Sequence, residues 1–199
     1  MDNIYFTDED LRRCAVFSEE QDSGHYGNRN QFNAKTKQRQ IFIGKLGEVV
    51  AWRALRSSEP DFEIYPPRKK NWKPDLQGNG FEFHVKSQEA EDAKKYGLSW
   101  TFQLSDAKGK GGKDLEIFKD HDGKSMIVFV GINYAEGYGK ILAVIAGRKL
   151  FDLKLFRDPK LPHLIGIKKV IYFDDLKKAN LVGATDHLSP IKNGKSAHK

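Results

Sequence analysis

Phe81-Glu82-Phe83-His84-Val85-Lys86-Ser87-Gln88 is the stretch of sequence that decides the fold, because apolar and polar side chains alternate along most of it. Successive side chains of a β-strand point to opposite faces of the sheet. Phe81, Phe83 and Val85 are therefore predicted to point into a core. The opposite face would carry an acid, an imidazole, an amine and an amide: Glu82, His84, Lys86 and Gln88. The stretch predicts a strand that is polar on one side only.

A turn precedes this strand, and an aspartate lies just before the turn. The turn is Gln77-Gly78-Asn79-Gly80, and Asp75 lies just before it. Gly and Asn are typical turn residues because they tolerate left-handed backbone conformations. A hairpin at this point would bring Asp75 beside the polar row of the strand.

A helix is predicted upstream, over residues 37–56, because its apolar residues recur with roughly helical spacing. Gly44 and Gly47 lie inside it. Each glycine costs about 1 kcal/mol relative to Ala in a helix interior. Two of them favour a packing or functional reason, since glycines would let another backbone or a phosphate group approach the helix closely. Glu48 directly follows the second glycine.

The rest of the chain alternates between helical and strand patterns. An N-terminal helix would start at Thr7, a suitable capping residue, and end near Glu20. Further strands are predicted at 62–65, 99–104, 126–134, 140–146 and 170–173, and helical segments at 89–96, 147–156 and 174–179. This order predicts an α/β fold with a central mixed β-sheet flanked by helices. The expected organisation is an N-terminal helix and loop (1–36), a core (37–180) and a basic C-terminal tail (181–199).

Composition narrows the class of protein. The 199 residues suit one domain with appendages, and an apolar content of 39% is typical of a globular chain. No apolar run reaches the length of a membrane span, and the N-terminal residues lack a secretory pattern. Cys14 is the single cysteine, which excludes an internal disulfide and a multi-cysteine zinc finger. We therefore expect a soluble, cytoplasmic protein without a membrane partner.

The formal net charge of +7 favours a polyanionic partner, because each neutralised phosphate releases condensed counterions. Charge alone is weak evidence, since many soluble proteins carry such an excess. The distribution of the positive charge adds to this evidence, because one basic cluster directly precedes Asp75. The candidate DNA-contacting residues are Arg68, Lys69, Lys70 and Lys73 in this cluster and Lys45 on the helix.

Carboxylates next to a lysine are a suitable set for the hydrolysis of phosphodiesters. A hard divalent cation takes oxygen ligands, so carboxylates anchor it. The cation neutralises the phosphate and lowers the pKa of a bound water. A lysine beside it orients that water or assists its deprotonation.

Lys73-Pro74-Asp75-Leu76 followed by His84-Val85-Lys86 resembles the core signature of the PD-(D/E)xK nuclease superfamily. In that superfamily, a Pro-Asp near the start of one strand is followed on the next by an acid, any residue and Lys. Gly44-Lys45-Leu46-Gly47-Glu48 resembles the helix that brings a glutamate to the same metal site. The resemblance covers about residues 44–88 and implies a restriction-endonuclease-like core.

The resemblance also implies an activity and roles for its residues. Asp75 would be the main ligand of Mg²⁺ or Mn²⁺, Glu48 a second ligand, and Lys86 would position or activate the attacking water. The implied function is a metal-dependent endonuclease, and the first choice is a restriction-type enzyme that cuts double-stranded DNA. A homodimer would supply the two sites that cutting both strands requires. The alternatives are a structure-specific junction, repair or phage nuclease, a catalytically silent DNA-binding module on the same fold, and an RNA-binding or RNA-cleaving protein.

His84 departs from the superfamily pattern, because it holds the position expected to carry Asp or Glu. Imidazole suits transition metals better than magnesium. His84 would then be a direct ligand that favours manganese, or Glu82 on the same face would supply the missing carboxylate, or metal binding would be weakened. Glu82 is therefore a secondary candidate. Gln88 is another, because it lies two residues past the lysine and resembles a frequent polar position of the superfamily. The competing interpretation is an ordinary amphipathic strand with a solvated face, on which Glu82 and Lys86 pair.

Overall fold

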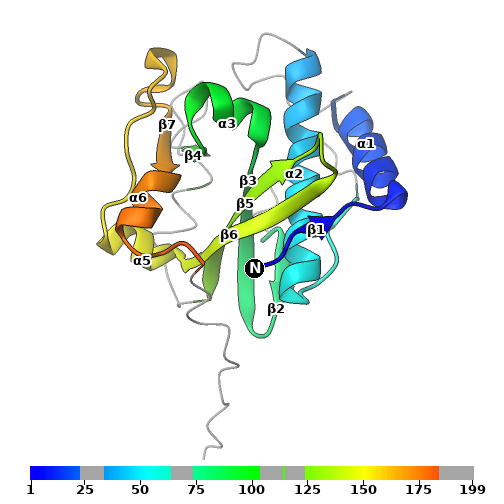
Figure 1. The fold of residues 1–199 in the computed structure, drawn as a ribbon, viewed down its shortest axis with the longest axis horizontal. Coiled ribbons are helices and arrows are strands. Elements are labelled where there is room, and N and C mark those ends of the chain that lie inside the picture. Colours follow the sequence, from blue (N-terminus) through cyan, green and yellow to red (C-terminus); the bar gives the residue numbers. More distant parts are fainter. Residues whose placement is uncertain (23–33, 64–73, 104–113, 115–123, 184–199) are drawn as a thin grey trace, which may run out of the picture.

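The computed structural model describes residues 1–22, 34–63, 74–103, 114 and 124–183 (Figure 1). The helices in chain order are α1 (Asp8–Asp22), α2 (Ala34–Leu55), α3 (Ala90–Tyr96), α5 (Gly147–Asp152) and α6 (Phe173–Lys178), with a 3₁₀ turn at Pro162–Leu164. The strands are β1 (Ile4–Tyr5), β2 (Leu76–Gly78), β3 (Phe81–Glu89), β4 (Ser99–Gln103), β5 (Ser125–Asn133), β6 (Tyr138–Ala146) and β7 (Lys168–Tyr172).

The central sheet has five strands in the order β1-β6-β5-β3-β2. β3 runs parallel to β5, and the other neighbours are antiparallel. Figure 1 shows α1 and α2 on one side of this sheet and β4, β7, α5 and α6 on the other. The predicted α/β fold with a mixed sheet between helices is therefore confirmed.

Two parts of the predicted strand pattern differ from the structure. β4 and β7 do not join the central sheet but pair with each other as a separate two-stranded sheet. The predicted strand at 62–65 is wrong at Phe62 and Glu63, which have no regular structure, and residues 64 and 65 lie outside the described residues. Phe62 instead packs edge-on against Phe17 of α1, with ring centroids 5.9 Å apart.

The buried apolar residues form two clusters, one on each face of the central sheet. Side chains of α2 pack against Phe81, Phe83 and alternate residues of β5 on one face. Ile127 and Phe129 of β5 pack against β4, α5, β7 and α6 on the other. Because β5 is covered on both faces, it is apolar at nearly every position rather than alternating.

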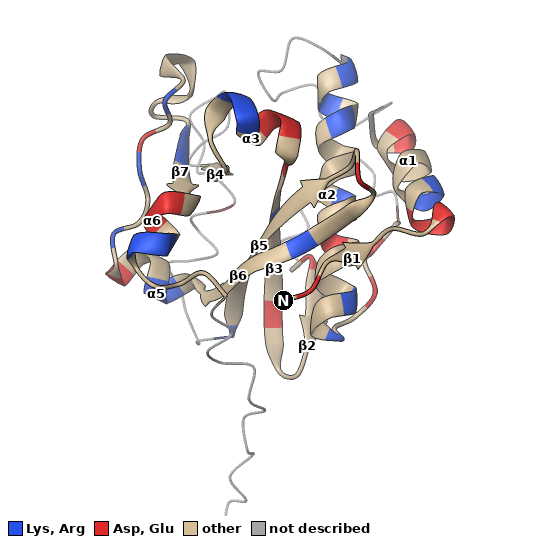
Figure 2. Ribbon diagram, viewed as in Figure 1, with Lys and Arg blue, Asp and Glu red and all other residues tan. Residues whose placement is uncertain are grey.

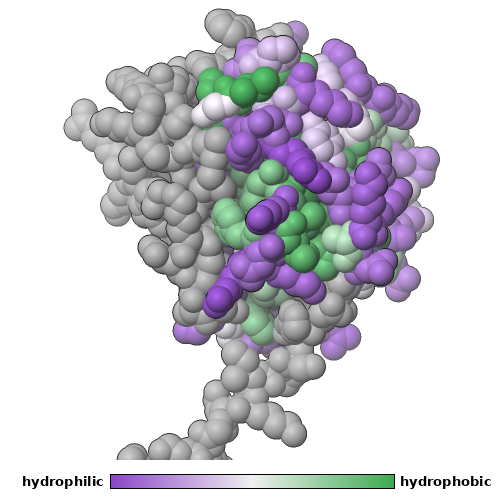
Figure 3. Space-filling view, turned by 90° about the vertical axis from the view of Figure 1, so that its left-hand side faces the viewer, coloured by the Kyte–Doolittle hydropathy of each residue, from purple (hydrophilic) through white to green (hydrophobic). Residues whose placement is uncertain are grey.

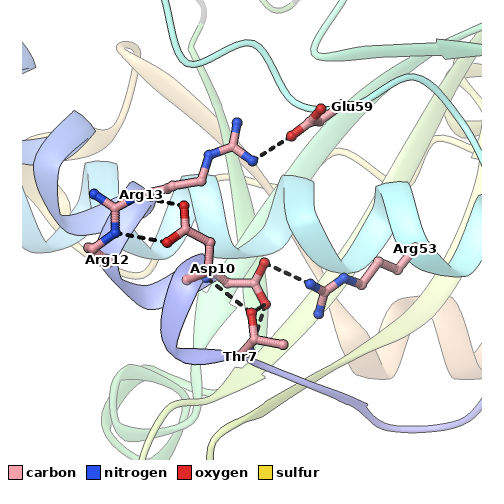
Figure 4. A network of polar contacts seen from close by, with 7 residues as sticks. Thr7, Asp10, Arg12, Arg13, Arg53 and Glu59 are labelled. Atoms are coloured by element: carbon pink, nitrogen blue, oxygen red, sulfur yellow. Dashed lines mark hydrogen bonds and ion pairs between the residues drawn. The ribbon is translucent and has the colours of Figure 1, made fainter.

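The start of α1 is held by a capping network that also ties α1 to α2 (Figure 4). The hydroxyl of Thr7 accepts a hydrogen bond from the backbone N–H of Asp10 at 3.2 Å, and the N–H of Thr7 donates to Asp10 Oδ2 at 2.7 Å. This is a capping box with Asp in place of Glu, and it confirms the predicted cap. The other carboxylate oxygen of Asp10 pairs with Arg53 of α2 at 2.8 Å.

The charged residues of the described surface are of both signs. Figure 2 shows Lys and Arg at several levels of α2, and Lys or Arg beside Asp or Glu on α1 and α3. Figure 3 turns the β7, α5 and α6 side toward the viewer, where an apolar patch lies among hydrophilic residues. Leu153, Ile165 and Val182 are among the exposed large apolar residues of this half of the chain. Within the described ranges, no helix combines the length and the apolarity that crossing a membrane requires.

The two glycines of α2 are expected to respond in opposite ways to replacement by alanine. A Cβ at Gly47 would lie 2.6 Å from Cβ of Ser87 on β3, whereas a Cβ at Gly44 would meet nothing within 4 Å. Gly47→Ala should therefore lower the free energy of unfolding by about 1–3 kcal/mol through overpacking. Gly44→Ala should raise it by about 0.5–1 kcal/mol, because alanine favours the helix. Urea unfolding of both variants measures the difference; equal stabilities would contradict the close approach of α2 to β3.

Candidate active site

The hairpin of β2 and β3 places Asp75 beside β3. Asn79 and Gly80 form its two-residue turn, and both have the positive φ angles (52° and 81°) that such turns require. β2 begins at Leu76, opposite Phe83, and no strand of the described residues pairs with β3 on this side beyond that point. Asp75 fills the start of this edge, since its Oδ2 accepts a hydrogen bond from the backbone N–H of Val85 at 2.7 Å. The predicted position of Asp75 beside the polar strand is confirmed.

The close contact between α2 and β3 brings Glu48 to the same edge. Gly47 lies against Ser87, whose hydroxyl donates to the backbone carbonyl of Ile43 at 3.1 Å. Glu48 is the next residue along α2, and its side chain is only 14% exposed. Its Oε2 lies 2.6 Å from Nζ of Lys45, one helical turn earlier.

The pKa of Glu48 reflects its burial and the charges around it. Burial raises this pKa from 4.5 to about 8. The negative charge of Asp75 raises it further, while the ion pair with Lys45 opposes the rise. Glu48 and Asp75 are therefore two carboxylates whose charges act on each other, here called the carboxylate pair, and Glu48 is largely buried. A cation between them would favour the ionised form of Glu48.

Lys45 lies inside this site rather than on the surface. Its Nζ donates to the backbone carbonyl of Asp61 at 2.6 Å and lies 4.5 Å from the ring centroid of Phe17. With a side chain 11% exposed and an ammonium already bonded to Glu48, it holds a carboxylate in place. Its predicted contact with DNA is thus not the role that its surroundings favour. The other predicted DNA contacts, Arg68, Lys69, Lys70 and Lys73, lie outside the described residues.

His84 and Lys86 belong to the other face of β3. They lie opposite Ile127 and Phe129 of β5, and both of these pack in the second cluster. His84 is 6% exposed, so the interpretation of a solvated polar face is wrong at this position. The physical reason is that β4 packs over this side of the strand, as the 5.3 Å distance from Lys86 Nζ to the ring centroid of Phe102 shows.

The two secondary candidates on this face have different surroundings. Gln88 anchors the start of β4, because its Oε1 accepts from the N–H of Ser99 at 2.5 Å and its Nε2 donates to the carbonyl of Gly97. These bonds account for Gln88 as a structural residue. Glu82 is half-buried at the beginning of β3, and its N–H donates to the carbonyl of Lys124.

Lys86 has an acidic partner that the sequence did not indicate. Its Nζ lies 2.8 Å from Oδ1 of Asp114. Asp114 follows a run of Gly and Lys and is 28 positions from Lys86 along the chain, so no local pattern could have connected them. Lys45 could have been found, because it is three residues before Glu48 on a predicted helix and such pairs face each other.

The structure thus brings Glu48 and Lys45 together beside Asp75 at β3, and it places Lys86 with Asp114 on the other face of this strand. Within the described part of the chain, no three His, Cys, Asp or Glu side chains form a group that could hold a metal ion. Two carboxylates still fit Mg²⁺, which is commonly bound by one or two carboxylates together with waters and substrate phosphates. The predicted role of His84 as a ligand stays a prediction.

No protein-family model matches this chain, and neither the curated proteins nor the solved structures give a significant match. The resemblance to the PD-(D/E)xK superfamily therefore rests on the sequence motif alone.

Proposed function

We propose that this protein is a metal-dependent endonuclease that hydrolyses phosphodiester bonds in double-stranded DNA, of restriction type. The observation that supports it best is the buried carboxylate of Glu48, whose pKa is raised by burial and by the charge of Asp75, which is itself bonded to β3. A buried carboxylate beside a second carboxylate is costly, and Lys45 offsets only part of this cost, since the pKa of Glu48 is still raised to about 8. Lys86 follows Val85, the residue that holds Asp75, so the strand that fixes the acid also carries the amine.

Asp75 and Glu48 would hold Mg²⁺ or Mn²⁺ through their carboxylate oxygens. When bound, the cation supplies charge neutralisation at the phosphate and a water of lowered pKa. The N–H of Val85 keeps Asp75 oriented, and Lys45 keeps Glu48 oriented through its 2.6 Å ion pair. Lys86 Nζ would donate a hydrogen bond to the attacking water and so orient its lone pair toward phosphorus.

The second candidate is a DNA-binding module that has lost catalysis. One observation favours it: the described residues provide two carboxylates and no third ligand in one group. Such a module would bind duplex DNA mainly through its excess positive charge, with strong salt dependence. A nuclease specific for junctions or for damaged DNA would share the proposed site and differ in its substrate.

Incubation of supercoiled plasmid with the protein tests the proposal. We expect nicking or linearisation with Mg²⁺ or Mn²⁺, none in EDTA, and strongly slowed cleavage with Lys86→Ala. Lys94→Ala is the matched control, because Lys94 lies on α3 with a side chain that is 72% exposed. A four-way junction, single-stranded DNA and RNA complete the substrate set. If the protein binds DNA but cleaves none of these substrates with either metal, the result would support the DNA-binding module that has lost catalysis.

A further inference from the structure

We infer that Asp114 is a positioning residue that holds the ammonium group of Lys86 in place for the proposed hydrolysis. The inference rests on the proposed function and adds to it a residue with no counterpart in the motif. Its basis is a chain of contacts that connects β3 to β4 through one carboxylate.

Both oxygens of the Asp114 carboxylate are engaged. Oδ1 lies 2.8 Å from Nζ of Lys86, and Oδ2 accepts a hydrogen bond from the backbone N–H of Gln103 at 2.8 Å. The second bond ties the carboxylate to the end of β4, so it presents Oδ1 to the lysine from a fixed direction. A charge-assisted bond of this length is among the stronger hydrogen bonds in proteins.

The ion pair is sheltered from solvent. The side chains of Lys86 and Asp114 are 21% and 20% exposed, whereas those of Lys94 and Glu91 on α3 are 72% and 66% exposed. Exposed pairs of the second kind contribute little, because water screens them and the side chains lose entropy. The partly buried pair is a stronger constraint on where its lysine points.

An aromatic ring restricts the same ammonium group from another direction. Lys86 Nζ lies 5.3 Å from the ring centroid of Phe102, within the range of a cation–π interaction. Phe102 is fully buried, so its ring is a rigid neighbour. A free lysine side chain samples many rotamers. Asp114 and Phe102 together remove much of this freedom before a substrate binds.

Fixing the amine matters for hydrolysis because Lys86 acts on a water whose position depends on Asp75. Asp75 is bonded to Val85, the residue next to Lys86 on β3. The backbone therefore fixes one end of Lys86 relative to the carboxylate pair, and Asp114 fixes the other end. Loss of Asp114 would free the amine without removing it.

The test is a double-mutant cycle of Lys86→Ala, Asp114→Asn and the combined variant, measured as cleavage of a DNA duplex with Mn²⁺. Asparagine retains an acceptor for the Gln103 N–H but loses the charge. We expect Asp114→Asn to lower kcat about 10- to 100-fold, the effect of misplacing a catalytic group. KM and the calorimetric affinity for Mn²⁺ should change by less than about twofold. In the Lys86→Ala background, Asp114→Asn should have no further effect on kcat.

Asp114→Glu keeps the charge and should recover part of the lost kcat, and Asp158→Asn, at an exposed pair with Lys169, is the matched control. If Asp114→Asn does not fold, Asp114→Ser takes its place in the cycle. Equal kcat for wild type and the variant, or additive losses in the cycle, would overturn the positioning role while the proposed function stands. A wild-type protein that cleaves nothing would instead overturn the proposed function and this inference together.

Discussion

Asp75→Asn is expected to lower metal-dependent DNA cleavage by about 1000-fold, since metal catalysis supplies several kcal/mol and each 1.36 kcal/mol is tenfold in rate. Asparagine can still accept the hydrogen bond that the N–H of Val85 donates to Asp75 Oδ2, so β3 keeps its edge contact. The substitution removes the negative charge that the cation needs. The measurement is single-turnover cleavage of a duplex with Mn²⁺, together with calorimetric titration of Mn²⁺ into the protein without DNA.

Cleavage and Mn²⁺ titration, together with the melting temperature, distinguish the loss of a metal ligand from unfolding of the protein. Asp92→Asn changes an exposed aspartate on α3 and should retain both cleavage and Mn²⁺ binding. Asp75→Asn should lose both, with a melting temperature close to that of wild type. Normal Mn²⁺ affinity in Asp75→Asn would show that the cation binds elsewhere and would remove Asp75 from the proposed site.

The hairpin could be predicted from sequence because its information is local. Alternation from Phe81 to Val85 indicated one apolar face, and the residues from Gln77 to Gly80 indicated a turn, which the structure narrows to Asn79 and Gly80. These two signals together placed Asp75 beside β3, as the structure has it. The cap at Thr7 was equally local, since it depends on residues three positions apart.

What covers the polar face of β3 could not be predicted in the same way. An alternating strand shows which side chains share a face, but not whether water or another layer of the protein meets that face. The covering layer, β4 with β7, forms through pairing of residues about 70 positions apart, such as Trp100 with Ile171. Burial of His84 and the pairing of Lys86 with Asp114 follow from this distant contact.

The structure also changes which lysine accompanies the carboxylates. The motif indicated Lys86, yet the lysine bonded to Glu48 is Lys45, from the helix itself. Lys45 partly compensates the negative charge that Asp75 and Glu48 bring together. The site thus has one lysine that stabilises an acid and another, on the opposite face of β3, that is held by an acid. The two lysines therefore differ in role, although both lie near β3: Lys45 stabilises Glu48, and Asp114 holds Lys86.

Stability in the absence of metal is expected to depend on pH through Glu48. Its pKa rises from 4.5 to about 8 because the side chain is buried beside Asp75. Between these values the folded protein retains a proton that the unfolded chain releases, so the free energy of unfolding falls as the pH rises. The stability present below pH 4.5 is lost progressively up to about pH 8. The loss is at most about 5 kcal/mol, because one pH unit corresponds to 1.36 kcal/mol.

Urea unfolding in EDTA across this pH range, for wild type and Glu48→Gln, measures the effect. Glutamine is close to Glu in shape and does not ionise, so Glu48→Gln should lose much less stability between pH 5 and 8 than wild type does. Glu91→Gln, at a side chain that is 66% exposed, should follow wild type. Added Mg²⁺ should reduce the loss in wild type, because a cation bound to the folded protein favours the ionised carboxylate. Parallel curves for wild type and Glu48→Gln would show that Glu48 is already ionised at neutral pH, and the carboxylate pair would then need no cation.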